Sequence, residues 1–142
     1  MSLLEIEQTA LDLLLAGDES DLEALRGQLS AATVLSRKFT GVGFFTTFAV
    51  DPDAPKASRG LILSDVMGEV TGLEHDAGFV LFARDGVVDV LECYIVDDAW
   101  PDNAKLLRAY YVHPEEPGSS RVVQTPRRDL EWALRKPLVS GQ

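Results

Sequence analysis

Hydrophobic positions recur at helical spacing at the start of the chain and alternate like strand residues through its middle. Leucines spaced by three and four predict a first helix over residues 3–16, which ends at Gly17. Ser20-Asp21-Leu22-Glu23 has the form of a capping box and predicts the start of a second helix of about ten residues. These two helices are expected to pack against each other as a hairpin.

From Thr33 the chain is rich in β-branched and aromatic residues, which is typical of strands. Asp85-Gly86 lies between two apolar runs and favours the positive φ angles of a two-residue type I′ hairpin turn. No helical crossover separates the strands, so the predicted sheet is an antiparallel meander of about five or six strands. Six strand segments are predicted: Val34–Thr40, Phe44–Val50, Leu61–Gly72, the two arms of Gly78–Val96, and Leu106–Val112. Val122-Val123 could add an edge strand.

A final helix is predicted to be capped at Thr125-Pro126 and to continue through Leu134. This order of elements predicts an α+β fold: a single domain over residues 1–142, with the sheet packed by the N-terminal helical hairpin and the C-terminal helix. The polar segment Asp51–Gly60, with its two prolines, is expected to be the most mobile part of the chain.

The Asp85-Gly86 turn also predicts which residues pair across the hairpin. An uninterrupted ladder places Arg84 opposite Val87 and Phe82 opposite Asp89. Arg84 and Asp89 then lie diagonally on one face, at a distance that allows an ion pair. Both faces of this hairpin are mostly apolar, so it is expected to be central and covered on both sides.

In the same register Glu92 lies among Phe79 and Val90, where a carboxylate must find a donor or take a raised pKa. Two interpretations stay open. In the structural one, an arginine or a helix N-terminus binds the Glu92 carboxylate. In the functional one, Glu92 orients a ligand or transfers a proton in a pocket between sheet and helices, lined by Phe44, Phe79, Glu92 and Tyr94.

The charge balance excludes some partners. The chain has 13 basic and 23 acidic residues, a net charge of −10, which repels nucleic acids and anionic membranes. No apolar run approaches the roughly 18 residues of a membrane span, and the N-terminus lacks the basic region of a signal peptide. With one cysteine, Cys93, no internal disulfide forms, and a cytoplasmic location is expected.

Reactive side chains are few. Cys93 lies in the middle of a predicted strand, where burial keeps a thiol protonated, and only His75 and His113 could serve as a base. Two histidines and one cysteine without close spacing do not indicate a zinc site. Neither a catalytic residue nor a metal or cofactor is predicted.

The segment Tyr94–Asn103 combines a large aromatic with an acidic rim: Trp100 is flanked by Asp97, Asp98 and Asp102. Such a combination suits a hot spot for a basic protein partner. The alternative is a loop pinned by a buried tryptophan, with the acids facing water.

The segments FTGVGFFTTFAV (Phe39–Val50) and DGVVDVLECYIVDDAWPDN (Asp85–Asn103) resemble a family of small bacterial proteins of uncharacterised function. That family carries an FTGVGFFT-type strand pair and a DG…LE…WP hairpin and loop, and the resemblance spans roughly Val34–Tyr111. It implies no activity and no catalytic residue. Size, acidity and order of elements are also similar to type III secretion chaperones and bacterial immunity proteins, without a shared motif.

These observations favour a non-catalytic, acidic cytoplasmic binding module that holds a basic protein in a chaperone- or immunity-like manner, with a homodimer left open. The alternative hypothesis is a small-molecule-binding protein or weak enzyme with a pocket around Glu92. A Glu92→Gln substitution distinguishes the two. Loss of ligand binding with the fold intact would support a pocket, whereas loss of stability alone would make Glu92 a structural residue.

Overall fold

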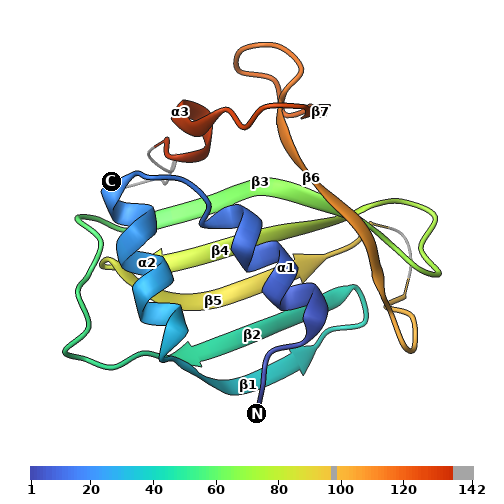
Figure 1. The fold of residues 1–142 in the computed structure, drawn as a ribbon. Coiled ribbons are helices and arrows are strands. Elements are labelled where there is room, and N and C mark those ends of the chain that lie inside the picture. The colour runs from blue at the N-terminus through green and yellow to red at the C-terminus, as the bar shows by residue number, and fades with distance from the viewer. Residues whose placement is uncertain (97–98, 136–142) are drawn as a thin grey trace.

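The strands of this protein form one antiparallel sheet, with helices on one of its faces (Figure 1). The structure is a computed structural model that describes residues 1–96 and 99–135. Its seven described strands confirm the predicted antiparallel α+β fold, with a higher strand count than the predicted five or six. The strands are β1 (Thr33–Phe39), β2 (Gly43–Ala49), β3 (Leu61–Val70), β4 (Ala77–Arg84), β5 (Val87–Tyr94), β6 (Leu106–Pro114) and β7 (Val122–Thr125).

The spatial order of the strands is β1-β2-β5-β4-β3-β6-β7. β3, β4 and β5 follow one another as hairpins, as in a meander. β2, however, pairs with β5, and β6 returns to the far side of β3. The connection from β2 to β3 therefore passes the ends of β5 and β4 (Figure 1). Apolar periodicity does not reveal this order, because it identifies strands but not their neighbours.

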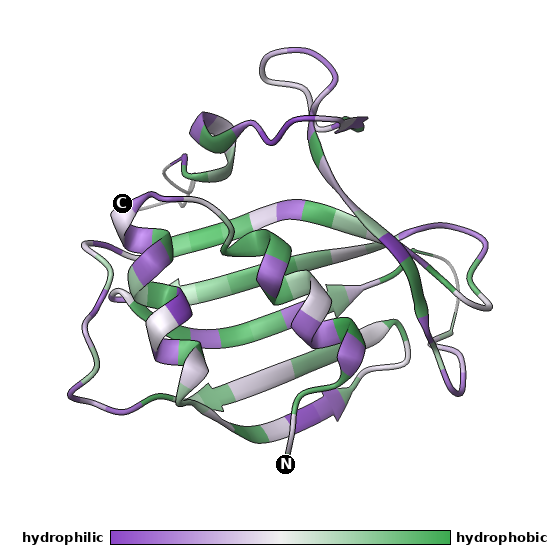
Figure 2. Cartoon of the chain, in the orientation of Figure 1, coloured by the Kyte–Doolittle hydropathy of each residue, from purple (hydrophilic) through white to green (hydrophobic). Residues whose placement is uncertain are grey.

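The helices α1 (Glu5–Leu14) and α2 (Ser20–Ser30) lie on the same face of the sheet (Figure 1). α1 packs on β3, β4 and β6, and α2 packs on β5. Hydrophobic side chains of both helices and of the strands beneath them form the core. Figure 2 shows hydrophobic residues along the ribbons of these helices and strands. The central core residues include Leu14, Leu22, Leu25, Phe44, Leu63, Phe79, Leu81 and Leu91.

The cap of α2 differs from the predicted capping box. The Glu19 carboxylate accepts hydrogen bonds from the backbone N–H groups of Asp21 (2.9 Å) and Leu22 (3.2 Å), so Glu19 is the N-cap and Ser20 is the first helical residue. Asp21 points to a different partner. Its carboxylate accepts from the backbone N–H and the hydroxyl of Ser58, at 2.7 and 2.8 Å.

The segment Asp51–Gly60, expected to be mobile, is held to the body of the protein at more than one point. Beyond the Ser58 contact, the Gln28 side chain donates to the carbonyls of Pro55 (3.0 Å) and Gly86 (2.9 Å). The Ala57 N–H donates to the Gly86 carbonyl at 3.0 Å. A polar side chain of α2 thus connects this segment to the β4–β5 turn.

The β4–β5 hairpin turns at Asp85-Gly86 and pairs Arg84 with Val87, as predicted. One step further the register shifts, and Phe82 lies opposite Val90 instead of Asp89. Asp89 is the extra residue of a β-bulge, which moves every later residue of β5 to the other face. The predicted Arg84–Asp89 ion pair is present, at 3.8 Å.

The C-terminal helix is much shorter than predicted. α3 spans Leu130–Ala133, and its N-cap is Asp129, whose carboxylate accepts from the Trp132 N–H at 3.0 Å. Thr125 instead ends β7, the predicted edge strand. Arg128 lies between them and binds the buried Asp65 carboxylate (2.7 and 3.1 Å). Across the described ranges, no helix is both long and apolar enough to cross a membrane.

Candidate functional site: the open sheet face and the cleft beside it

The sheet face opposite α1 and α2 carries apolar side chains that no described helix covers. One row of cross-strand neighbours runs Lys38, Phe45, Glu92, Val80, and a second runs Thr47, Val90, Phe82, Ile62. Most of these side chains are half-buried, and Phe45 is 37% exposed. We call this surface, together with Met67 and Tyr94 at its end, the open face. Among the described residues, helices cover the β4–β5 hairpin on one side only, whereas the sequence predicted cover on both sides.

Glu92 lies near the middle of the open face, between Phe45 of β2 and Val80 of β4. Burial raises the pKa of its carboxyl group, with no charge or hydrogen bond among the described residues contributing to the shift. The structural interpretation required an arginine or a helix N-terminus, and neither contacts Glu92 in the described part of the chain. The carboxylate is thus partly desolvated and uncompensated.

The pocket predicted from the sequence does not form as one site. Phe44 and Phe79 lie on the helix-covered face, at 1% and 0% exposure, whereas Glu92 and Tyr94 lie on the open face. The Asp89 bulge is the reason. Its extra residue turns the side chains of Glu92 and Tyr94 to the opposite face of the sheet, while the direction of β5 is unchanged. The Tyr94 ring lies over Gly78, where a Cβ atom would come within 2.1 Å of its Cζ.

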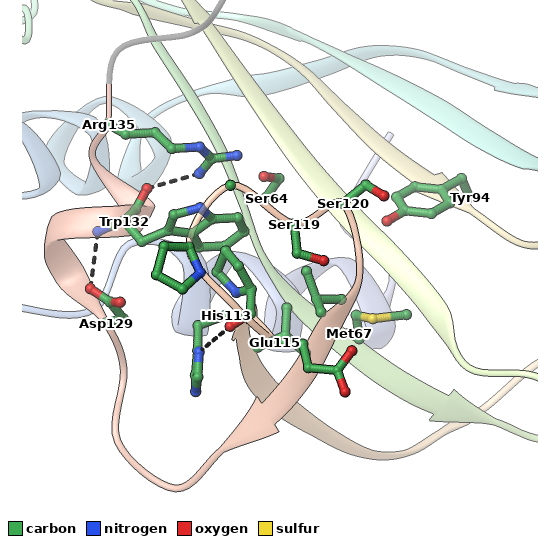
Figure 3. Close-up of a pocket in the computed structure, with 15 residues that line it drawn as sticks. Ser64, Met67, Tyr94, His113, Glu115, Ser119, Ser120, Asp129, Trp132 and Arg135 are labelled. Carbon is green, nitrogen blue, oxygen red and sulfur yellow. Dashed lines mark hydrogen bonds between the residues drawn. The ribbon is translucent and has the colours of Figure 1, made fainter.

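At its β3 edge the open face leads into a cleft of about 860 Å³ (Figure 3). Ser64, Met67 and Tyr94 contribute from the sheet. The remaining lining comes from the end of β6, the β6–β7 connection, and α3 with its flanking residues. The lining residues with polar or aromatic side chains there are His113, Glu115, Ser119, Ser120, Asp129, Trp132 and Arg135.

Arg135 and Trp132 contact each other in this cleft through a cation–π interaction and a hydrogen bond. The Arg135 guanidinium lies 3.8 Å from the centre of the Trp132 ring and donates to the Trp132 carbonyl at 2.8 Å. Burial lowers the pKa of Arg135, the direction expected for a desolvated cation. Sequence analysis missed this pair, although a tryptophan and an arginine three residues apart near a helix end are a recognisable stacking signal.

Three of the other reactive groups, His113, Ser119 and Cys93, are hydrogen-bonded or buried. The His113 Nδ1 atom lies 2.8 Å from the Pro114 carbonyl, and the Ser119 hydroxyl accepts from the Arg121 N–H. Cys93 is 1% exposed on the helix-covered face, and burial strongly raises the pKa of its thiol. Within residues 1–96 and 99–135, no three histidine, cysteine or acidic side chains gather as a metal site requires.

Trp100 is half-buried. Its ring meets Phe44 edge-on, with 5.2 Å between ring centres, and its backbone N–H donates to the Gly41 carbonyl at 3.1 Å. This is the geometry of a loop pinned by its tryptophan. Asp102 is exposed, whereas Asp97 and Asp98 lie outside the described residues.

Comparison of the chain with protein-family models, curated proteins and solved structures returns no match.

Proposed function

We propose that this protein is a non-catalytic binding module that holds a basic protein partner against its open face. The observation that carries the proposal is the one-sided covering of the sheet: helices pack on one face, and the other presents apolar side chains around an uncompensated carboxylate.

The apolar character of the open face supports an interface. Antiparallel sheets with one solvated face normally alternate apolar residues inside with polar residues outside. Here the outward positions of β4 include Val80 and Phe82, with Val90 and Phe45 beside them. A contiguous apolar surface rimmed by polar residues is typical of a protein–protein contact.

Charge favours a basic partner. Two ion pairs lie at the borders of the open face, Arg108 with Glu69 at 3.1 Å and Arg84 with Asp89 at 3.8 Å. Glu92 has no such partner among the described residues, so an arginine or lysine of the binding protein would compensate its partial desolvation. The net charge of −10 would also accelerate encounter with a cationic protein.

A second copy of the chain fits the open face less well. Two copies each carry a net charge of −10, and a symmetric face-to-face dimer would bring two Glu92 carboxylates toward each other. A dimer formed through the open face would therefore contradict the proposal of a basic partner.

The test compares two open-face variants with one matched control. Phe45→Ser removes an apolar side chain that is 37% exposed, and Glu92→Lys reverses the central charge. Val123→Ser, at a 39% exposed valine on β7, removes a similarly exposed side chain elsewhere. Affinity capture from the native cells identifies the partner, and titration of the purified pair measures its affinity at increasing salt.

We expect a basic partner that the wild-type protein and Val123→Ser retain and that both open-face variants lose. Its affinity should fall as salt rises, because the contact is partly electrostatic. It should also fall as pH is lowered through the raised pKa of Glu92, since protonation removes the charge that the partner binds. Retention by both open-face variants, an acidic partner, or a concentration-dependent dimer in sedimentation would each contradict the proposal.

A further inference from the structure

We propose a second binding site, in the cleft between β3, the β6–β7 connection and α3, for a small organic acid with an anionic head and an apolar body. This inference does not rest on the proposed function. Its ligand differs, and its anion-binding residue, Arg135, lies outside the open face, although Met67 and Tyr94 border both sites.

Arg135 provides the site for the anionic head. The Cζ atom of its guanidinium lies over the Trp132 ring, 3.8 Å from the ring centre, which restricts where its N–H groups lie. The described residues accept one hydrogen bond from it, at the Trp132 carbonyl, and form no ion pair with it. No other described residue accepts from it, so its remaining N–H groups can bind a planar carboxylate or a phosphate through two parallel hydrogen bonds.

The carboxylates near Arg135 already have partners. Asp65 is bound by Arg128 through two hydrogen bonds, and Asp129 caps α3 by accepting from the Trp132 N–H. Glu115, at the cleft margin, forms an ion pair with Arg121 at 3.6 Å. Arg135 therefore forms no ion pair with a described residue, although the nearby charge of Asp65 partly stabilises the cation. The protein as a whole is strongly negative.

One part of the cleft suits an apolar body. Met67, the buried Val112 and the rings of Trp132 and Tyr94 line it. In Figure 3 the Arg135 side chain extends toward Ser64, and Tyr94 lies at the opposite end of the view. The volume of about 860 Å³ falls within the range of small-molecule sites. One cation with apolar walls selects a singly or doubly charged organic acid over an inorganic anion.

The test uses three probes that share one ring: phenylacetate, phenyl phosphate and the neutral phenylacetamide. The chain contains two tryptophans, so the two indole N–H signals in a nitrogen-15 spectrum report on the cleft and on Trp100 separately. Trp132→Phe assigns them. Titrations are repeated with Arg135→Gln and with Arg127→Gln, an exposed arginine that does not line the cleft.

We expect a saturable shift of the Trp132 signal with phenylacetate or phenyl phosphate and an affinity for phenylacetamide about tenfold weaker. Arg135→Gln should weaken binding of the anions about tenfold and remove their advantage over the amide, whereas Arg127→Gln should change neither. The anion that binds with the higher affinity shows whether the head group of the ligand is a carboxylate or a phosphate. Phe45→Ser should bind the probes like the wild-type protein, which separates this site from the open face.

Three results would overturn the inference: no saturable shift of the Trp132 signal, equal affinity for the anions and the amide, or equal weakening by Arg127→Gln and Arg135→Gln. The dispersion of the backbone amide signals shows whether each variant is folded, so a loss of binding in a folded Arg135→Gln protein is interpretable.

Discussion

Glu7 and Asp65 are buried carboxylates, and an arginine from a distant part of the chain holds each of them. Arg37 of β1 approaches Glu7 through Nε and Nη2, at 2.9 and 2.6 Å, and the Thr46 hydroxyl and the Leu4 N–H also donate to the Glu7 carboxylate. A buried charge needs this full set of donors, because removal from water is otherwise too unfavourable.

Glu7→Ala should lower the free energy of unfolding by about 3–5 kcal/mol, because Arg37 is left as a nearly buried cation without its carboxylate. Denaturation with urea measures the change. Glu5→Ala, at an exposed position in the same helix turn, is the control and should shift stability by less than about 0.5 kcal/mol. Equal effects of the two substitutions would show that the Glu7–Arg37 pair contributes no specific stability.

Glu92 shows the opposite situation, a carboxylate with a raised pKa and no described donor. Its folded-state pKa lies above the usual value of 4.5, so the folded state binds the proton more tightly than the unfolded state. The wild-type protein should therefore lose stability relative to Glu92→Gln as pH rises through the interval between these two pKa values. Above that interval Glu92→Gln should be the more stable protein, by less than about 1 kcal/mol.

Thermal unfolding of both proteins across this pH range measures the difference. Glu69→Gln is the control, since Glu69 is exposed and paired with Arg108, and its replacement should not stabilise the protein. A Glu92→Gln protein that is less stable than wild type at neutral pH would show that Glu92 has a stabilising partner.

Glu92 was recognisable from the sequence as an ionisable residue among apolar neighbours, whereas the buried Glu7 and Asp65 were not. Glu92 stood out because its strand neighbours are apolar, which is a local signal. Glu7 lies in an amphipathic helix among other acids, and its arginine is 30 residues away. Asp65 and Arg128 are 63 residues apart. Pairing over such distances depends on the fold, so no local pattern indicates it.

Among the elements, the β4–β5 turn and the Asp51–Gly60 segment support each other. Gly86 has a φ of +80°, and a Cβ atom on it would come within 2.3 Å of the Ala57 carbonyl oxygen. The same glycine's carbonyl accepts from the Ala57 N–H and from Gln28. The turn glycine is thus required both by its backbone angle and by the close approach of another segment.

Gly86→Ala should lower the free energy of unfolding by about 3 kcal/mol or more, from the positive φ together with the clash against Ala57. Gly118→Ala is a matched control, with a φ of +81° and no atom within 4 Å of the added carbon. Gly118→Ala should lower the free energy of unfolding by about 1 kcal/mol, the cost of the positive φ alone. Similar losses in the two variants would mean that the segment at Ala57 moves away without penalty.

The Asp89 bulge is the element-scale feature that most changes the functional interpretation. The Asp85-Gly86 turn and its first pair were predicted, because turn chemistry is local. The extra residue was not, since a bulge has no strong sequence signal without glycine. It carries Cys93 to the helix-covered face and Glu92 to the open face, so the predicted pocket separates into two sides of the sheet.

On the scale of the whole molecule, the sheet has a helix-covered face and an open face. Cys93 shows how completely water is excluded from the helix-covered face. It is 1% exposed, lies opposite Phe79 and Phe44, and has a pKa raised first by burial and then by the Glu7 and Glu92 charges. A thiol in such a site has neither access nor the thiolate form that reacts.

Cys93 should therefore react with a disulfide reagent only when the protein unfolds, at a rate equal to that of global opening. The release of coloured thiol, followed beside hydrogen exchange of the core amides, measures both rates. Complete reaction in denaturant is the control for reagent and thiol. A labelling rate far above core exchange would show that α1 and α2 separate from the sheet without global unfolding.

By itself, the sequence determined the helix-forming ends, the strands between them, the β4–β5 turn and the negative charge, because each follows from residues close together in the chain. Only the tertiary structure decided that β2 pairs with β5, that Glu92 faces away from the helices, that Arg128 holds Asp65, and that Trp132 and Arg135 face a cleft beside β3. These features join segments far apart in the chain, and which of many compatible pairings forms is settled by packing over the whole molecule.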